Sequence, residues 1–338
     1  MNFKWVFDYI RKWPTYIPYQ FRTAKRPLIL TINLTNNCNS HCIMCTFWKN
    51  KKRINEITPD EIRQMLQQDI MKELTTVALT GGEIFLRPDI AEIIDIIYET
   101  TGVKPHFGTN GLLPSKLDAL LQNHKDKIGG IMISVDGIGD VHDAIRGKGT
   151  FAITMKTLTM LKEKYNIYPT INMTLCKQNY TNLLETASYF KDYIFTYKIA
   201  KKSKFHFGDN TTEDFELTPD QIKQVLKDAE KITQKNLYDV FLEDWAVFGK
   251  RPLPCYAGIT QIVINQDGTV QPCIHKPPLG NIRQDSLPAL WHSPAAQKFK
   301  KGHKNCQECY ERCTVETFFI DYPRWVLLSK LKKYKTKL

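Results

Sequence analysis

Residues 28–45 read LILTINLTNNCNSHCIMC, an apolar run that leads directly into a loop with three cysteines. Cys38, Cys42 and Cys45 are spaced C-x3-C-x2-C, so the loop can curl and place their three thiolates around one metal centre. A structural zinc site needs a fourth ligand, and the nearby candidate, His41, sits inside the loop in an unfavourable direction. Three cysteines favour a [4Fe–4S] cluster with one iron left open for a substrate. The alternative, three ordinary buried thiols, fits poorly with a loop that directly follows an apolar strand.

Four further motifs each lie at or soon after the end of an apolar stretch that reads as a strand. They are TGGE at residues 80–83, GTNG at 108–111, SVDG at 134–137 and HDAIRG at 142–147. Together with the cysteine loop, and in this order, they resemble the radical S-adenosylmethionine (SAM) superfamily over roughly residues 28–207. Met44 departs from the pattern, because many members carry an aromatic residue there.

The resemblance implies a cofactor set and a reaction. The cluster on Cys38, Cys42 and Cys45 would bind the amino and carboxylate groups of SAM at its open iron. An electron, from a donor such as flavodoxin or ferredoxin, would then cleave SAM to methionine and a 5′-deoxyadenosyl radical, which abstracts a hydrogen atom from the substrate.

The resemblance and the chemical type of each residue also assign the expected SAM contacts. The backbone of Gly81 and Gly82, with the Glu83 carboxylate nearby, suits the SAM ammonium, although a Gly-Gly pair by itself can be a plain turn. Arg146 suits the SAM carboxylate through its planar fork, against the alternative of a surface arginine. The remaining expected contacts are Ser134 and Asn110 at the ribose, Asp136 at the ribose or fixing its loop, and Met44 at the adenine.

Alternating strand and helix patterns predict the fold class. Six β/α units imply parallel strands with outer helices, an α/β fold that matches the partial (β/α)6 TIM-type barrel of the resembled family. Such barrels carry their chemistry at the C-terminal ends of the strands, where the motifs lie. The predicted strands are 28–34, 75–80, 104–108, 130–135, 168–175 and 203–207. The predicted helices are 58–73, 89–100, 114–123, 150–165, 180–194 and 218–235.

A second group of cysteines lies in the last quarter of the chain, at Cys255, Cys273, Cys306, Cys309 and Cys313. Asp267-Gly268 between two short apolar runs predicts a hairpin that ends near Cys273. The region resembles the SPASM or twitch extensions of the family, which hold auxiliary iron–sulfur clusters, but its cysteines suffice for one cluster only. Cys255 and Cys273 are the expected ligands, joined by two of the other three. The alternative is a zinc knuckle.

The ends of the chain are basic and aromatic. The formal net charge is +12, and much of the excess lies in residues 1–27 and in the lysines after residue 329. Such ends suit peripheral contact with an anionic membrane, against the alternatives of a helix packed on the barrel and a solvated tail. No RNA-binding signature is present, so no nucleic-acid partner is expected. Without a signal peptide or an apolar membrane span, the expected location is cytoplasmic, with association at the inner membrane surface.

The sequence therefore predicts a radical SAM enzyme with one auxiliary cluster. The expected organisation is an extension over 1–27, a barrel over 28–245, an auxiliary-cluster subdomain over 246–320 and a tail over 321–338. The substrate is left open among small molecules, sugars, lipids and peptides, although about 27 residues before the first strand are too few for a separate peptide-recognition domain. The alternatives are a zinc-stabilised binding protein without catalysis and a radical SAM enzyme acting on RNA.

Overall fold

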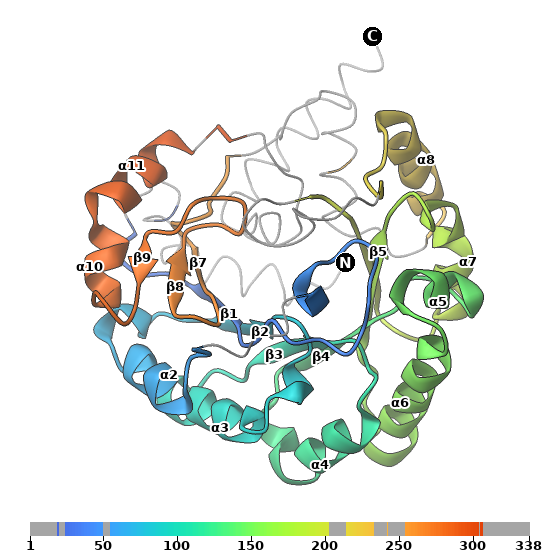
Figure 1. Ribbon diagram of the computed structural model, residues 1–338, viewed down its shortest axis with the longest axis horizontal. Coiled ribbons are helices and arrows are strands. Elements are labelled where there is room, and N and C mark those ends of the chain that lie inside the picture. The colour runs from blue at the N-terminus through green and yellow to red at the C-terminus, as the bar shows by residue number, and fades with distance from the viewer. Residues whose placement is uncertain are drawn as a thin grey trace, which may run out of the picture.

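A curved sheet with helices on its outer side forms the body of the molecule (Figure 1). The computed structural model describes residues 19, 24–49, 55–202, 214–232, 242, 254–303, 305 and 306. The strands are β1 (Ile29–Asn33), β2 (Thr76–Thr80), β3 (His106–Thr109), β4 (Gly130–Ser134), β5 (Thr170–Leu175), β6 (Phe195–Ile199), β7 (Gln261–Ile264), β8 (Thr269–Gln271) and β9 (Gly280–Asn281). The helices are α2 (Pro59–Leu66), α3 (Ile90–Thr101), α4 (Pro114–His124), α5 (Asp140–Arg146), α6 (Thr150–Tyr165), α7 (Leu183–Tyr189), α8 (Pro219–Ala229), α10 (Leu287–His292) and α11 (Pro294–Gly302).

The strands form one open sheet in the order β6-β5-β4-β3-β2-β1-β7-β8-β9. Neighbours from β6 to β7 pair in parallel, and β8 and β9 add antiparallel strands beyond β7. Within the described residues β6 and β9 are the two edges, so the sheet does not close on itself. This is the expected α/β fold with a partial barrel of parallel strands.

Alternation along the strands separates the core from the barrel interior. Leu30 and Ile32 of β1 are fully buried and pair with Val77 and Leu79 of β2, which belong to the same apolar core as the outer helices. The intervening positions of the later strands are more polar, and Ser134, Asn172 and Thr174 line the pocket described below. The strand sequence therefore directs apolar side chains outward to the helices and polar side chains inward.

Two helices begin as their sequences predict. Thr58 at the start of α2 accepts a hydrogen bond from the backbone of Glu61, whose carboxylate accepts one from the Thr58 backbone in return. Thr218 and Gln221 form the same reciprocal cap on α8, and a proline follows each capping threonine. The predicted helix starts near 58 and 218 are confirmed.

The prediction for the sixth strand was wrong in position. The strand that pairs with β5 is Phe195–Ile199, whereas the predicted strand 203–207 lies outside the described residues. The sequence FTYKI alternates apolar residues with a threonine and a lysine, a pattern typical of a strand, so the local signal was present and was overlooked. The predicted helix over 180–194 also overran, because α7 ends at Tyr189 and the chain turns there toward β6.

The C-terminal hairpin continues the barrel sheet. The predicted turn at Asp267-Gly268 joins β7 to β8, with Gly268 at a φ of +82°. Strand β7 lies parallel to β1, with Ile262 opposite Leu30. The side chain of Arg283 reaches from beyond β9 to both oxygens of Glu61 in α2, at 2.6 and 3.0 Å. The last quarter of the chain is therefore joined to the barrel by backbone pairing and by an ion pair.

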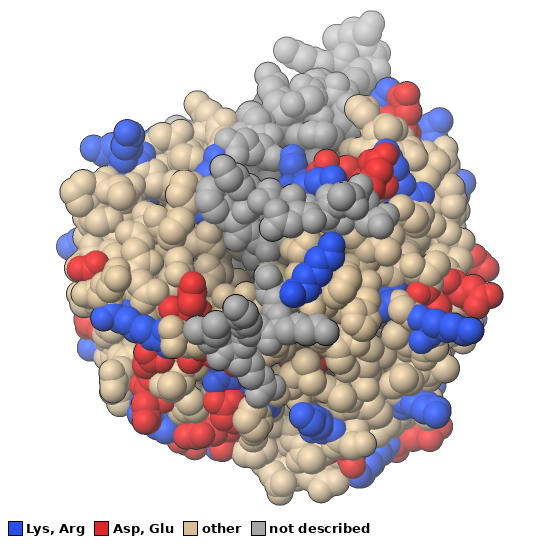
Figure 2. Space-filling model, viewed as in Figure 1, with Lys and Arg blue, Asp and Glu red and all other residues tan. Residues whose placement is uncertain are grey.

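Charged side chains of both signs are interspersed on the face shown in Figure 2. The predicted tail over 321–338 and residues 1–18 of the predicted extension lie outside the described residues. Within the described part of the chain, none of the helices is long and apolar enough to cross a membrane.

Candidate active site

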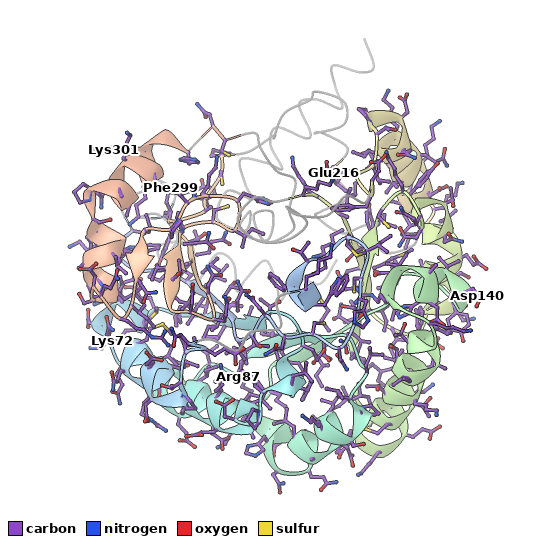
Figure 3. The ribbon with its side chains drawn as sticks, viewed as in Figure 1. Lys72, Arg87, Asp140, Glu216, Phe299 and Lys301 are labelled. Carbon is purple, nitrogen blue, oxygen red and sulfur yellow. The ribbon has the colours of Figure 1, made fainter. Side chains whose placement is uncertain are left out.

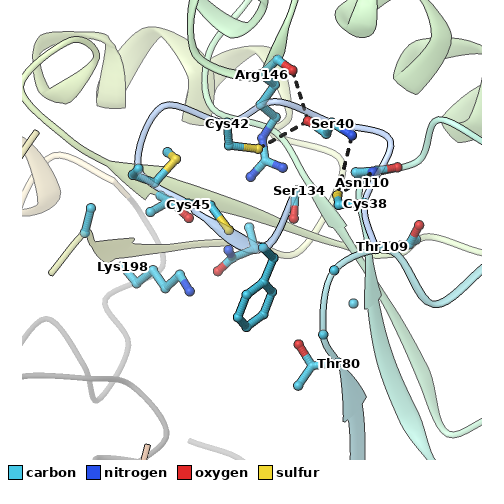
Figure 4. A pocket seen from close by; sticks show the side chains of 18 of the residues that line it. Cys38, Ser40, Cys42, Cys45, Thr80, Thr109, Asn110, Ser134, Arg146 and Lys198 are labelled. Carbon is cyan, nitrogen blue, oxygen red and sulfur yellow. Dashed lines mark hydrogen bonds between the residues drawn. The ribbon is translucent and has the colours of Figure 1, made fainter. Parts of the chain in front are cut away.

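A pocket of about 220 Å³ opens at the C-terminal ends of the parallel strands (Figure 4). The cysteine loop forms one wall, and the ends of β2 to β6 form the others. Of the predicted site residues, the structure brings together on this pocket Cys38, Cys42, Cys45, Met44, Gly81, Gly82, Asn110, Ser134 and Arg146. Glu83 and Asp136 lie behind the wall, fully buried.

The glycine pair lets the cysteine loop lie directly against the end of β2. The Gly82 and Glu83 backbone N–H groups donate to the carbonyls of Thr35 and Asn37, each at 2.7 Å. A Cβ atom at Gly82 would overlap the Asn37 carbonyl, and one at Gly81 would overlap the Thr35 carbonyl. Glycine is therefore required here by the close approach of the cysteine loop.

Glu83 anchors the neighbouring strand end from inside the wall. Its carboxylate accepts hydrogen bonds from the hydroxyl of Thr109 at 2.8 and 2.9 Å, from the Asn110 backbone at 2.8 Å and from the Phe85 backbone at 3.2 Å. Burial raises the pKa of Glu83, and these donors oppose the rise. The carboxylate is thus occupied in holding the β3 end in place.

The turn held by Glu83 directs Asn110 at the cysteine loop. The Asn110 side-chain amide donates to the side-chain oxygen of Asn39 at 2.8 Å and approaches the Cys38 sulfur at 3.8 Å. Asn110 therefore lines the pocket with its amide directed toward the loop.

Arg146 reaches the pocket from the end of α5. Its Nε donates to the carboxylate of Asp136 at 2.6 Å, and that carboxylate also accepts from the Thr174 backbone at 2.7 Å. Burial alone would lower the pKa of Arg146, but the adjacent Asp136 carboxylate holds it above its ordinary value. Behind the pair, burial lowers the pKa of His142 to about 4, so its ring is neutral and accepts from the Asp136 backbone at 3.2 Å.

The three loop cysteines form a donor set for an iron–sulfur cluster. Burial raises the pKa of Cys38 to about 12 and that of Cys45 to about 11, so iron binding would have to displace their protons. No carboxylate or imidazole stands among the described lining residues to add a fourth ligand. Among the described residues, no three cysteine, histidine, aspartate or glutamate side chains gather closely enough to hold a single metal ion. Three separated thiols fit the wider [4Fe–4S] cluster better than one zinc ion.

The second cysteine group also comes together in part. Cys255 and Cys273 are buried in one small cluster, and Cys306 packs against it. Cys309 and Cys313 lie outside the described residues. Cys176 is fully buried and packs in the apolar cluster that contains Cys42 and Met44, but it does not line the pocket.

Sequence reasoning missed several residues of this site. Lys198 of β6 lines the pocket, and it was missed because the strand was placed too late in the chain. Asn172 and Thr174 could have been found from the polar alternation of the segment TINMTL. Arg87, labelled in Figure 3, is buried and donates to the carbonyls of Leu34 and Ile57 at 3.0 and 2.9 Å, which fixes the start of the cysteine loop.

Comparison with known families agrees with this geometry. Residues 32–190 match the radical SAM superfamily, and residues 255–314 match the SPASM family, described as an iron–sulfur cluster-binding domain. The two stretches together make up more than half of the chain.

Two curated proteins and one solved structure are similar over much of the chain. The antilisterial bacteriocin subtilosin biosynthesis protein AlbA of Bacillus subtilis is 30% identical over 80% of this chain and 61% of its own length. The mycofactocin maturase MftC of Mycolicibacterium smegmatis is 29% identical over 60% of this chain and 52% of its own length. The structure of Streptococcus suis SuiB bound to precursor peptide SuiA superposes with a TM-score of 0.66 at 18% identity, over 86% of this chain and 70% of SuiB.

The chain thus spans between about half and two thirds of the length of these two curated relatives. The structural likeness to SuiB, at this low sequence identity, shows a shared fold alone. The family matches, the cysteine-lined pocket and the order of motifs agree with one another. The chain belongs to the radical SAM superfamily and carries a SPASM domain, so its cofactors are SAM, a [4Fe–4S] cluster and an auxiliary iron–sulfur cluster.

Proposed function

We propose that the chain is a radical SAM maturase that modifies a peptide. The observation that carries the proposal is the pocket itself, where buried Cys42, the half-buried Cys38 and Cys45, and Arg146 meet at the C-terminal ends of the barrel strands. A [4Fe–4S] cluster bound there would supply the electron that cleaves SAM and so provide a 5′-deoxyadenosyl radical to take a hydrogen atom from the substrate.

In this proposal the residues of the wall divide into ligand contacts and supports. Cys38, Cys42 and Cys45 hold the cluster, and Arg146 pairs with the SAM carboxylate while Asp136 fixes the direction of its guanidinium. Glu83 acts as a positioning residue for the β3 end. The remaining proposed SAM contacts are the backbone of Gly81 and Gly82, the hydroxyl of Ser134 and the side chain of Met44.

For Asn110 the geometry favours a different role from the ribose contact predicted from the motif. Its amide donates to Asn39 and approaches the Cys38 sulfur, so we assign it to holding the cysteine loop. The auxiliary cluster is assigned to Cys255 and Cys273, with Cys306, Cys309 and Cys313 as the candidates for its other ligands.

The choice of a peptide rests on the relatives. AlbA is a bacteriocin biosynthesis protein, and MftC is a maturase. These relatives favour a peptide among the small molecules, sugars, lipids and peptides that the sequence left open. A one-electron donor such as flavodoxin or ferredoxin remains a prediction of the same proposal.

Isotope transfer tests the peptide substrate. A short peptide encoded beside this gene is made with deuterated side chains and incubated anaerobically with the reconstituted chain, SAM and dithionite. We expect deuterium in the 5′-deoxyadenosine and a change in the peptide mass. A scrambled peptide of the same composition is the control. If 5′-deoxyadenosine forms without deuterium, the peptide assignment is wrong although SAM cleavage stands.

A further inference from the structure

Ser40 is a buried serine in the cysteine loop, and its hydroxyl contacts both the side chain of Cys42 and the backbone of Arg146. It is 1% exposed. Its Oγ lies 3.2 Å from the Cys42 sulfur and donates to the Arg146 carbonyl at 3.0 Å (Figure 4). Its backbone N–H donates to the Cys38 sulfur at 3.4 Å. This residue therefore joins two cysteines of the loop to the end of α5.

The hydroxyl has one proton and two acceptors within reach. While Cys42 carries its own proton, the thiol can donate to Ser40 and the hydroxyl to Arg146. A cysteine bound to iron has lost its proton, so its sulfur can only accept. The backbone N–H of His41 also donates to the Arg146 carbonyl, at 3.3 Å, so that carbonyl keeps a donor when the hydroxyl turns away.

We propose that the Ser40 hydroxyl donates to the Cys42 sulfur once the cluster is bound, and that it raises the reduction potential of that cluster. The inference rests on the proposed function, since it requires a cluster on this loop. One-electron reduction adds negative charge to the cluster and its sulfurs, and no proton moves, because the hydroxyl keeps its hydrogen throughout. A donor at the sulfur stabilises the more negative reduced state most.

Burial increases the effect of this one contact. Both Ser40 and Cys42 lie almost entirely out of water, where a hydrogen bond is electrostatically stronger than at the surface. The contact from Asn110 to Cys38 is longer, at 3.8 Å, and the same amide is already engaged with Asn39 at 2.8 Å. Ser40 is therefore the side chain with the larger expected influence.

The test compares Ser40→Ala with a matched variant in the same loop. Thr46 is a buried threonine next to Cys45 and, within the described residues, its hydroxyl makes no hydrogen bond to a cysteine, so Thr46→Ala removes a hydroxyl without removing a sulfur contact. Each protein is reconstituted anaerobically with iron and sulfide. Midpoint potentials are read by EPR from the signal that changes when SAM is added, which separates this cluster from the auxiliary one. The midpoint does not depend on the fraction of chains loaded.

We expect reduction of the Ser40→Ala cluster to be about tenfold less favourable, a midpoint about 59 mV more negative for one electron. Thr46→Ala should match the wild type, and Ser40→Thr, which keeps a hydroxyl, should restore the potential. Equal midpoints for Ser40→Ala and Thr46→Ala would overturn the inference. So would equal shifts in Ser40→Ala and Ser40→Thr, since those would reflect packing.

A measurement on the wild-type protein needs no variant. The Fe–S stretching bands in the resonance Raman spectrum should move when the protein is transferred to D₂O, and unchanged bands would contradict the inference. A wild-type chain that shows no SAM-responsive signal at all would instead overturn the proposed function, and this inference with it.

Discussion

The carboxylate of Glu83 shows what a single buried residue contributes to this site. It lies behind the pocket wall and gathers donors from Thr109, Asn110 and Phe85. The Asn110 backbone donates to Glu83, and the Asn110 side-chain amide donates to Asn39 in the cysteine loop. The carboxylate that the sequence predicted near the SAM ammonium therefore aligns one strand end with the loop.

Replacing Glu83 with Gln should weaken both folding and activity. The amide offers one acceptor oxygen, and its NH₂ group faces donors that then lack a partner. We expect a loss of about 1–3 kcal/mol in the free energy of unfolding, measured with urea, together with slower SAM cleavage. Glu92→Gln, on the exposed side of α3, is the control and should change neither quantity. Wild-type stability in Glu83→Gln would contradict the network.

Gly82→Ala should displace the cysteine loop. The added methyl group would overlap the carbonyl of Asn37, which is backbone and has little room to move. We expect less iron bound per chain after reconstitution, measured by a colorimetric iron assay. Gly302→Ala near the end of α11, where a Cβ meets open space, should load as the wild type does. Equal iron content in both variants would show that the close approach is unimportant.

At the scale of elements, local signals predicted some features and failed at others. Capping residues Thr58 and Thr218 marked two helix starts because they act within four residues of sequence. Strand β6 was misplaced although its sequence FTYKI alternates apolar and polar residues, a local strand signal that was overlooked beside the predicted helix over 180–194. The pairing of β7 with β1 joins residues far apart in the sequence, and no local pattern carries that information.

The contact between α2 and the C-terminal extension makes a prediction about pH. The hydrogen bonds from Arg283 hold the pKa of Glu61 at about 2, below its ordinary value of about 4.3. A lowered carboxyl pKa means that the pair stabilises the fold above about pH 4.3 and loses this effect as the pH falls toward 2. Arg283→Met should therefore cost about 1 kcal/mol at pH 7, a difference from wild type that shrinks below pH 4 in urea unfolding.

The control for this prediction is an exposed pair on the same side of the barrel. Lys72→Met removes one of the two basic partners of Asp69 at the surface, where water screens the charges and Arg26 still pairs with Asp69. Its stability should equal that of the wild type at every pH. A cost for Arg283→Met that stays constant down to pH 2 would contradict the ion-pair assignment.

At the scale of the whole molecule, the excess positive charge and the candidate active site lie in different parts of the sequence. The pocket lies in the barrel, whereas much of the net charge of +12 lies in the two ends of the sequence. Composition could indicate that these ends meet an anionic surface, but composition alone does not choose the partner. That the motifs of the site meet at one pocket could be predicted because they lie at strand ends, which a parallel sheet places together.

Truncation tests the proposed membrane contact. Five lysines follow residue 329, and each basic residue near an anionic bilayer contributes about 1 kcal/mol of attraction. We expect the full chain to float with vesicles containing phosphatidylserine more than a chain ending at residue 324 does, and high salt to remove the difference. Neutral phosphatidylcholine vesicles are the control. Equal flotation of both forms would exclude the tail from membrane binding.

The central claim is that Cys38, Cys42 and Cys45 hold the cluster that cleaves SAM. Its most direct measurement is the amount of 5′-deoxyadenosine formed from SAM and dithionite by the reconstituted chain, quantified by mass spectrometry. Cys42→Ala should abolish the product and still retain the auxiliary cluster. Cys176→Ala, which removes a neighbouring buried thiol that does not line the pocket, should still form it. Undiminished 5′-deoxyadenosine from Cys42→Ala, or none from the wild type, would contradict the account.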